Sequence, residues 1–183
     1  MSDTICTERL LLRPLRPTDA EALYTLFGDW EVIRWLSTPP WPYTLDDARS
    51  FIAGQLALEA TETDYLAITL EGALIGGIDC RSTRAAEAAS RSRVLGYWLG
   101  QPFWGRGYMT EAARAFVGHL FASTAEDAIF SGAFADNAAS LRVQNKLGFE
   151  RSGEDMRYCR PHGEKRVHVN TRLARLQFLA KSS

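Results

Sequence analysis

Residues 96–100 read Gly-Tyr-Trp-Leu-Gly, and residues 104–113 read Trp-Gly-Arg-Gly-Tyr-Met-Thr-Glu-Ala-Ala. This order predicts a short apolar strand, a loop with two glycines, and the first turns of a helix. The first N–H groups of a helix lack an intrahelical acceptor and carry a partial positive charge. Gly105 and Gly107 can adopt a positive φ and let a ligand approach the main chain. The stretch therefore predicts an anion site, most naturally for a phosphate or pyrophosphate.

A strand-to-helix turn that needs its glycines only for steric reasons would give the same pattern, and this alternative stays open. Two other phosphate-binding loops fit poorly. A P-loop needs Gly-Lys-Ser or Gly-Lys-Thr, which the chain does not contain. A dinucleotide-binding loop needs a third glycine where Thr110 stands, and it opens a βαβ unit instead of lying mid-chain.

A second segment, residues 136–150, reads Asp-Asn-Ala-Ala-Ser-Leu-Arg-Val-Gln-Asn-Lys-Leu-Gly-Phe-Glu and follows a predicted strand over residues 129–134. Its pattern of Asn-x-x-Ser, a helix, and Lys-x-Gly-Phe resembles the GNAT superfamily of N-acetyltransferases. Together with the motif at residues 104–113, it is similar to the RimJ/RimL-like branch, the ribosomal-protein acetyltransferases. The resemblance covers nearly the whole chain, from residues 9–15 to residues 167–170.

Strands that alternate with helices indicate an α/β class of the α+β type. The length of 183 residues suits one domain, so we expect residues 1–183 to form a single N-acetyltransferase domain. The resemblance implies a mixed, mostly antiparallel central sheet flanked by helices. It also implies that the central strands splay apart to admit acetyl-CoA.

The periodicity predicts elements that the structure can test. Strands are expected over residues 9–15, 65–70, 74–80, 94–99, 129–134, 157–159 and 165–173. Helices are expected from Pro17 to Gly28, from the capping box Thr44-x-x-Asp47 to about residue 60, over residues 107–123, and over residues 137–147. Glu71-Gly72 is expected to turn a hairpin, and residues 81–93 are expected to form an exposed loop.

Composition excludes several classes of partner. The formal net charge of -1 gives no bulk attraction to nucleic acid or to an anionic membrane. Cys6, Cys80 and Cys159 form no CxxC pair, which indicates reduced thiols in a cytoplasmic protein. The chain starts without an apolar signal core and has no apolar run long enough for a membrane helix.

The resemblance assigns acetyl-CoA to the glycine loop. It implies that loop N–H groups bind the pyrophosphate and that the main chain near Trp98 and Leu99 pairs with the pantetheine arm like an added strand. One N–H group there would polarise the thioester carbonyl. The loop residues implied are Gly105, Arg106, Gly107, Met109 and Thr110. The chain departs from many members at Pro102, where they carry Gln or Arg, so a side-chain contribution at that position is in doubt.

Asn137 and Ser140 have two interpretations. As a helix N-cap, Asn137 or Asp136 would bond the first turn, and Ser140 would simply lie in it. The resemblance implies instead that Asn137 contacts the pantetheine and that Ser140 lies near the sulfur, where it can donate to the leaving thiolate. Lys146 is a further candidate for contact with a CoA phosphate, with a solvated helix charge as the plainer interpretation.

The general base is harder to identify. Many relatives place a Glu two residues before Gly-Tyr-Trp, where this chain has Val94. Asp79, on the neighbouring predicted strand, is the best acidic candidate, with a solvent-facing or edge Asp as its alternative. Tyr158 is a rival for the acid role, although a strand Tyr commonly serves packing.

No metal site is expected, because the spacing of His119, His162 and His168 does not make a ligand set. An aromatic group flanks a Pro-rich turn and either packs a helical cap or lines the acceptor cleft. It comprises Trp30, Trp35, Trp41 and Tyr43. In the second case, Asp29 and Glu31 would attract a cationic amine.

We therefore expect an acetyl-CoA-dependent N-acetyltransferase that acts on a primary amine, either a protein N-terminus or a small molecule, by direct transfer in a ternary complex. The cysteines lie in no motif for a covalent acyl intermediate. The alternative is an acetyl-CoA-binding regulatory module with little or no catalysis. The sequence does not indicate the oligomeric state.

Overall fold

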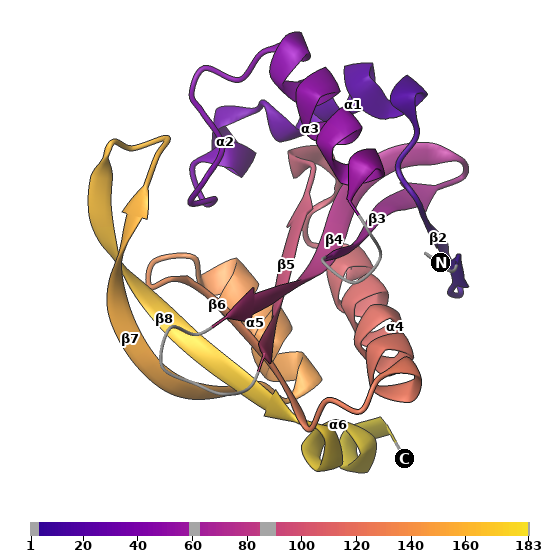
Figure 1. Ribbon diagram of the computed structural model, residues 1–183, viewed down its shortest axis with the longest axis vertical. Helices are drawn as coiled ribbons and strands as arrows, with labels where there is room; N and C mark the ends of the chain where they lie inside the picture. Colours follow the sequence, from indigo (N-terminus) through magenta and orange to yellow (C-terminus); the bar gives the residue numbers. More distant parts are fainter. Residues whose placement is uncertain (1–3, 59–62, 85–90, 183) are drawn as a thin grey trace.

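A computed structural model describes residues 4–58, 63–84 and 91–182 (Figure 1). Its elements, in chain order, are β1 (Ile5–Cys6), β2 (Leu10–Arg13), the 3-10 helix η1 (Pro17–Asp19), α1 (Ala20–Phe27), α2 (Trp30–Ile33), α3 (Leu45–Ala57), β3 (Thr63–Leu70), β4 (Ala73–Arg84), β5 (Arg91–Leu99), the 3-10 helix η2 (Gln101–Phe103), α4 (Tyr108–Ser123), β6 (Ala128–Phe134), α5 (Ala138–Leu147), β7 (Glu150–Cys159), β8 (Glu164–Ala174) and α6 (Arg175–Ser182).

The strands form one mixed sheet in the order β1-β2-β3-β4-β5-β6-β8-β7. Neighbouring strands are antiparallel except β5 and β6, which are parallel. The fold is therefore of the expected α+β type, with a mixed and mostly antiparallel sheet.

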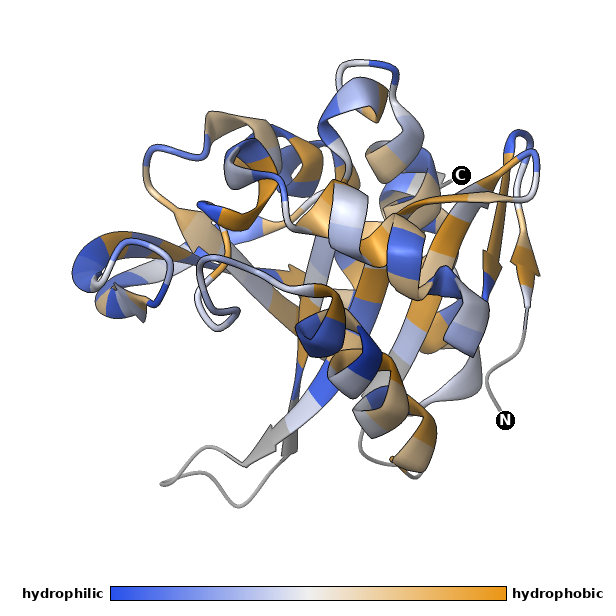
Figure 2. Cartoon of the chain, turned by 90° about the horizontal axis from the view of Figure 1, so that it is seen from above, coloured by the Kyte–Doolittle hydropathy of each residue, from blue (hydrophilic) through white to orange (hydrophobic). Residues whose placement is uncertain are grey.

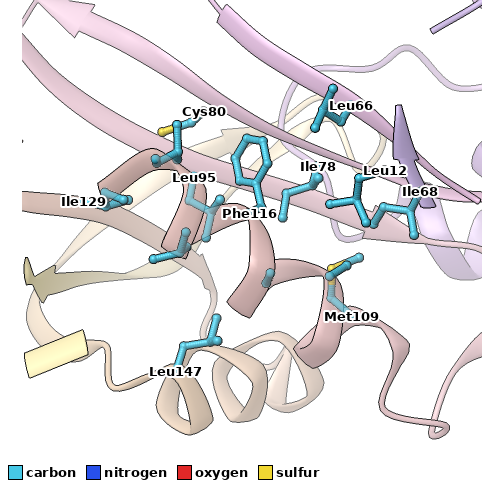
Figure 3. Packing of buried hydrophobic residues seen from close by; sticks show 14 of the residues in the cluster. Leu12, Leu66, Ile68, Ile78, Cys80, Leu95, Met109, Phe116, Ile129 and Leu147 are labelled. Carbon is cyan, nitrogen blue, oxygen red and sulfur yellow. The ribbon is translucent and has the colours of Figure 1, made fainter. Parts of the chain in front are cut away.

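Helices cover both faces of this sheet. On one face, α4 and α5 pack against the strands around Phe116, which Figure 3 shows near Leu95 and Ile78. On the other face, α1, α2 and α3 form a helical cap with a second core that includes Leu23, Ile33 and Trp98. We call these the α4–α5 face and the cap face. Figure 1 also shows the β7–β8 hairpin curving away from the rest of the sheet.

Several local signals act as the sequence predicts. Thr44 and Asp47 form the capping box that starts α3, and Gly28 ends α1. Gly148 ends α5 with a φ of 101°, and the β3–β4 hairpin turns through Glu71 and Gly72. Figure 2 shows hydrophilic and hydrophobic residues mixed along each helix, as expected when one side of a helix is buried.

The prediction of an exposed loop over residues 81–93 is wrong at both ends, because strands extend into it. β4 continues to Arg84 and β5 begins at Arg91, with register pairs from Arg81–Val94 to Arg84–Arg91. Main-chain pairing does not require apolar side chains, so two polar strands can extend a hairpin that begins in the core. The rest of this expected loop, residues 85–90, lies outside the described residues.

Other boundaries also differ. β7 begins at Glu150 instead of residue 157, because its exposed polar residues give no apolar signal. β1 and α6 were not expected, and α3 ends at Ala57. Among the described residues, no helix is long and apolar enough to cross a membrane.

Candidate active site

The sheet is split between its two central strands. β5 and β6 pair only at Arg93–Ile129 and Val94–Phe130. One residue further, the Ser131 hydroxyl donates to the Leu95 carbonyl at 3.0 Å. Beyond that bond, the described register has no β6 partner for residues 96–99. The splayed central strands that the resemblance implies are therefore present.

The main chain of β5 offers specific groups to this split. Gly100 N–H donates to Ile75 O at 2.9 Å, which places every second residue of β5, Trp98 included, in hydrogen-bonded pairs with β4. Leu95, Tyr97 and Leu99 alternate with these residues and direct their N–H and carbonyl groups toward the split. The Leu99 carbonyl already accepts from the Trp104 indole at 2.6 Å. The main-chain groups left to a ligand are thus those of Tyr97 and the Leu99 N–H.

The glycine loop leads from β5 into α4. Gly105 and Gly107 have φ values of 75° and 81°, so both need the left-handed region that favours glycine. Gly107 is the N-cap of α4, and no described side chain caps this end. The first intrahelical bond runs from Glu111 N–H to Gly107 O, which leaves the N–H groups of residues 108–110 without an intrahelical acceptor. This end can therefore hold an anion.

A brace from the N-terminal segment fixes the same loop. The Arg9 guanidinium lies 2.6 Å from Glu111 Oε2, and its NH1 donates to Arg106 O at 3.1 Å. Glu111 Oε1 accepts from Thr7 Oγ1 at 2.6 Å and from Arg9 N at 2.9 Å. Burial alone would raise the pKa of the Glu111 carboxyl, but the bonds from Thr7 and Arg9 outweigh it and hold the pKa below its usual value. Sequence reasoning missed this brace, because its partners lie about a hundred residues apart.

The start of α5 faces β5 across the split. Asn137 Oδ1 accepts from Ser140 N–H at 3.1 Å, so the N-cap interpretation of Asn137 is confirmed. The cap uses one oxygen and leaves the amide nitrogen for another partner. Ser140 Oγ lies 2.9 Å from the Tyr97 hydroxyl of β5. Ser140 therefore lies at the end of the Tyr97 side chain, on the α4–α5 face.

Asp79 lies on the opposite, cap face. It pairs across the sheet with Gly96 of β5, and a Cβ on Gly96 would come within 2.6 Å of Asp79 Oδ1. The carboxylate thus lies over β5 at the start of the split. Arg81 Nε binds the other oxygen at 2.6 Å. Burial raises the pKa of the Asp79 carboxyl, and the Arg81 guanidinium only partly offsets the shift.

The comparisons with known proteins agree with this geometry. The model of the acetyltransferase (GNAT) domain matches residues 9–150. The chain belongs to the GNAT family. The N-acetyltransferase p20 of Bacillus licheniformis is 28% identical over 153 residues, which are 82% of this chain and 84% of p20. The matched domain makes this GNAT chain an acetyltransferase.

Two solved GNAT structures share the fold. Mycobacterium smegmatis RimJ, in complex with CoA-disulfide, has a TM-score of 0.83 and 23% identity over 96% of this chain and 88% of RimJ. The microcin C7 self-immunity acetyltransferase MccE, in complex with acetyl-CoA and AMP, has a TM-score of 0.77 and 20% identity over 91% of this chain and 93% of MccE. RimJ- and RimL-like proteins are thus among its structural relatives.

The remaining candidate residues lie further from the split. Tyr158 is on β7 opposite Lys165, beyond the end of β6, and is 52% exposed. Lys146 is exposed on α5. Among the described residues, no three His, Cys, Asp or Glu side chains gather as metal ligands would.

Some members of the aromatic group pack inside the helical cap, and others contact the β7–β8 hairpin. Tyr43 is buried beside Phe27 in the cap, as the packing interpretation predicts. Trp30 contacts Trp41 and His162, with ring centroids 5.0 and 5.1 Å away. Further contacts join the cap to the hairpin: Arg160 N–H donates to Ser37 O at 2.9 Å, and Arg166 lies over Trp35. The cap and the hairpin therefore meet on the cap face, the face that carries Asp79.

Proposed function

We propose that the chain, acting as one domain over residues 1–183, transfers an acetyl group from acetyl-CoA directly to a primary amine in a ternary complex. The observation that carries the proposal is the position of the split. The Ser140 hydroxyl lies on the α4–α5 face of the split, and the Asp79 carboxylate lies on its cap face. Acetyl-CoA entering along α4 and α5 would present its thioester between the two.

The cofactor would be held mainly by main-chain groups. The uncapped start of α4 and its loop would bind the pyrophosphate, through N–H groups of Gly105, Arg106, Gly107, Met109 and Thr110. The side chain of Met109 is buried in the core, so only its N–H can take part. The pantetheine would pair with Tyr97 and Leu99, next to Trp98, and contact the Asn137 amide. RimJ and MccE, solved with CoA-disulfide and acetyl-CoA, support this ligand class.

The transfer requires one bond to form and one to break. The amine nitrogen attacks the thioester carbon, whose oxygen would accept from a main-chain N–H in the split. The amine proton passes to Asp79, whose burial raises its proton affinity. The C–S bond then breaks, and the electron pair leaves on sulfur as a thiolate. The Ser140 hydroxyl would donate to that thiolate, and we favour it over Tyr158 because Tyr158 lies on the exposed hairpin.

The acceptor would reach the thioester from the cap face, where Asp79 lies. Asp29 and Glu31 stand at the start of α2, next to the aromatic contacts between cap and hairpin. Both a protein N-terminal amine and a small-molecule amine fit this chemistry. The net charge of the chain gives no reason to include nucleic acid or a membrane surface.

The deciding experiment measures free-thiol release from acetyl-CoA with a panel of N-terminal peptides, polyamines, amino acids and aminoglycosides. We expect turnover with at least one amine class, and the class identifies the acceptor as a protein or a metabolite. Binding of acetyl-CoA, seen as thermal stabilisation, without turnover for any amine would instead favour a regulatory binding module. Failure to bind acetyl-CoA would overturn the proposal.

A further inference from the structure

A chain of hydrogen-bonded side chains continues from Ser140 into the protein interior. Ser140 Oγ is 2.9 Å from the Tyr97 hydroxyl on β5 and 3.3 Å from Gln144 Nε2, one turn further along α5. Gln144 Oε1 in turn accepts from Thr171 Oγ1 on β8 at 2.7 Å. Gln144 and Thr171 are buried, with 1% and 5% of their surfaces exposed. The chain thus joins β5, α5 and β8 beneath the split.

The Gln144 amide points its oxygen toward Thr171 and its nitrogen toward Ser140. An amide oxygen only accepts, so the Thr171 hydroxyl must be the donor in this pair. The amide nitrogen then faces Ser140 and donates to Oγ. In this orientation Thr171 holds the Gln144 oxygen, and Ser140 Oγ receives a hydrogen bond from the Gln144 nitrogen.

Tyr97 is hydrogen-bonded to the same oxygen, and either hydroxyl of this pair can be the donor. Burial raises the pKa of the Tyr97 hydroxyl, although bonds to Ser140 and Gln144 act against the shift, so Tyr97 keeps its proton at neutral pH. The hydroxyl also lies 3.1 Å from the Ser140 carbonyl, so its one proton is shared between two oxygens of Ser140. A hydroxyl has one proton and two acceptor lone pairs. In the arrangement that we infer, Gln144 and Tyr97 both donate to Ser140 Oγ, and the Ser140 proton is then free for a ligand in the split.

We propose that Tyr97, Gln144 and Thr171 are positioning residues that turn the Ser140 hydroxyl into a fixed hydrogen-bond donor for the sulfur of CoA. The inference rests on the proposed function, because it assigns the split to acetyl-CoA. It goes beyond that function by naming the side chains that decide how strongly Ser140 can stabilise the thiolate. A serine hydroxyl that receives two hydrogen bonds is a better donor than one that is free to rotate.

The direct readout is the pKa of the CoA thiol when CoA itself is bound. Thiolate absorbs in the far ultraviolet, so the difference between pH titrations of the complexes with CoA and with desulfo-CoA, which lacks the thiol, gives this pKa without an acceptor amine. We expect the protein to lower it by about one unit, the size of a hydrogen bond to a charged group. Ser140→Ala should remove most of this shift. Thr171→Val and Tyr97→Phe should each remove about half, because each removes one link that fixes the donor.

Two variants serve as matched controls. Thr171→Ser keeps the hydroxyl and should keep the lowered thiol pKa. Thr69→Val removes a threonine hydroxyl that is also buried but donates to Leu11 O at 2.8 Å on β2. It should lower thermal stability without changing the thiol pKa. Once an acceptor is known, Thr171→Val should lower kcat about fivefold with little change in the KM for acetyl-CoA, and this loss should vanish in a Ser140→Ala background.

The outcomes separate this proposal from the proposed function. If Ser140→Ala abolishes the thiol shift but folded Thr171→Val and Tyr97→Phe both retain it, the positioning chain is wrong and the role of Ser140 stands. If CoA binds but neither wild type nor any variant shifts the thiol pKa, Ser140 does not face the sulfur. Both the role of Ser140 toward the thiolate and the positioning chain then fail. If the shift responds as expected but no amine is acetylated, the positioning chain stands and the transferase reaction is what fails.

Discussion

The Asp79 carboxylate occupies the space that a side chain on Gly96 would need, since a Cβ there would come within 2.6 Å of Asp79 Oδ1. We predict that Gly96→Ala pushes the carboxylate off β5 and lowers kcat at least tenfold while acetyl-CoA binding is retained. The chain should still fold, because the atom that must move is the end of a side chain. Gly54→Ala, where a new Cβ meets nothing within 4 Å, is the control. Steady-state kinetics and a binding titration would check both variants, and normal kcat for Gly96→Ala would argue against Asp79 as the base.

Asp79→Asn should show opposite effects on activity and stability. The pKa of Asp79 is raised in the folded protein, so the activity of the wild type should rise with pH as the carboxyl ionises. Asp79→Asn should lower kcat about a hundredfold and should lack this rise of activity with pH. A raised folded pKa means that stability falls as pH climbs from the unfolded pKa through the folded one. The Asp79→Asn protein should therefore have a higher melting temperature than wild type at pH 7, and the difference between the two melting temperatures should shrink toward pH 4. A variant less stable than wild type at pH 7 would contradict the sign.

A carboxylate at residue 94 should replace the one at residue 79. Residues 94 and 96 lie on the same face of β5, so a Glu at Val94 projects beside the position of the Asp79 carboxylate. We predict that adding Val94→Glu to Asp79→Asn raises kcat at least tenfold above that of Asp79→Asn alone. Val94→Gln in the same background is the isosteric control and should restore nothing. Equal rescue by Glu and Gln would show that packing, and not a base, is recovered.

The sequence predicts the parts of this site that depend on local chain conformation. Positive φ at Gly105 and Gly107, the α4 start and the Asn137 cap all follow from short motifs. Contacts between segments distant in sequence gave no such signal. Arg9 and Glu111, or Tyr97 and Ser140, meet only because the sheet order brings them together. The Tyr97 side chain carried one weak clue, because its polar hydroxyl stands between Leu95 and Leu99 at alternate positions of β5.

Gly107→Val should weaken acetyl-CoA binding at least tenfold. The residue would be strained at a φ of 81°, and its branches would enter the space over the α4 start where the phosphate is expected. Gly72→Val is a matched control, because Gly72 has a φ of 85° in the β3–β4 turn with nothing within 4 Å of its Cβ. Both variants should lose stability, and only Gly107→Val should lose affinity in a calorimetric titration. The assigned pyrophosphate site fails if the two bind acetyl-CoA equally well.

Glu111→Gln tests the brace on the loop. The Glu111 carboxylate accepts from Thr7 and from Arg9, so the neutral amide should cost about 1–3 kcal/mol at pH 7 and weaken acetyl-CoA binding severalfold. Its folded pKa is lowered, so this stability is present above the unfolded pKa and is lost as pH falls through the folded one. Chemical denaturation of both proteins between pH 3 and 7 should therefore give curves that converge at acid pH. A stability gap that does not change with pH would assign the loss to packing instead of charge.

Asn137 combines two roles that substitution can separate. Its side-chain oxygen caps α5, and its amide nitrogen is the group we assign to the pantetheine. Asn137→Ser keeps a cap acceptor and removes the amide, so it should retain stability but weaken acetyl-CoA binding about fivefold to tenfold. Asn137→Ala should lose the same affinity and also about 1 kcal/mol of stability. Thermal melts with and without acetyl-CoA give both quantities. If Asn137→Ser binds like wild type, the residue is a cap alone, and the pantetheine is held by the main chain of β5.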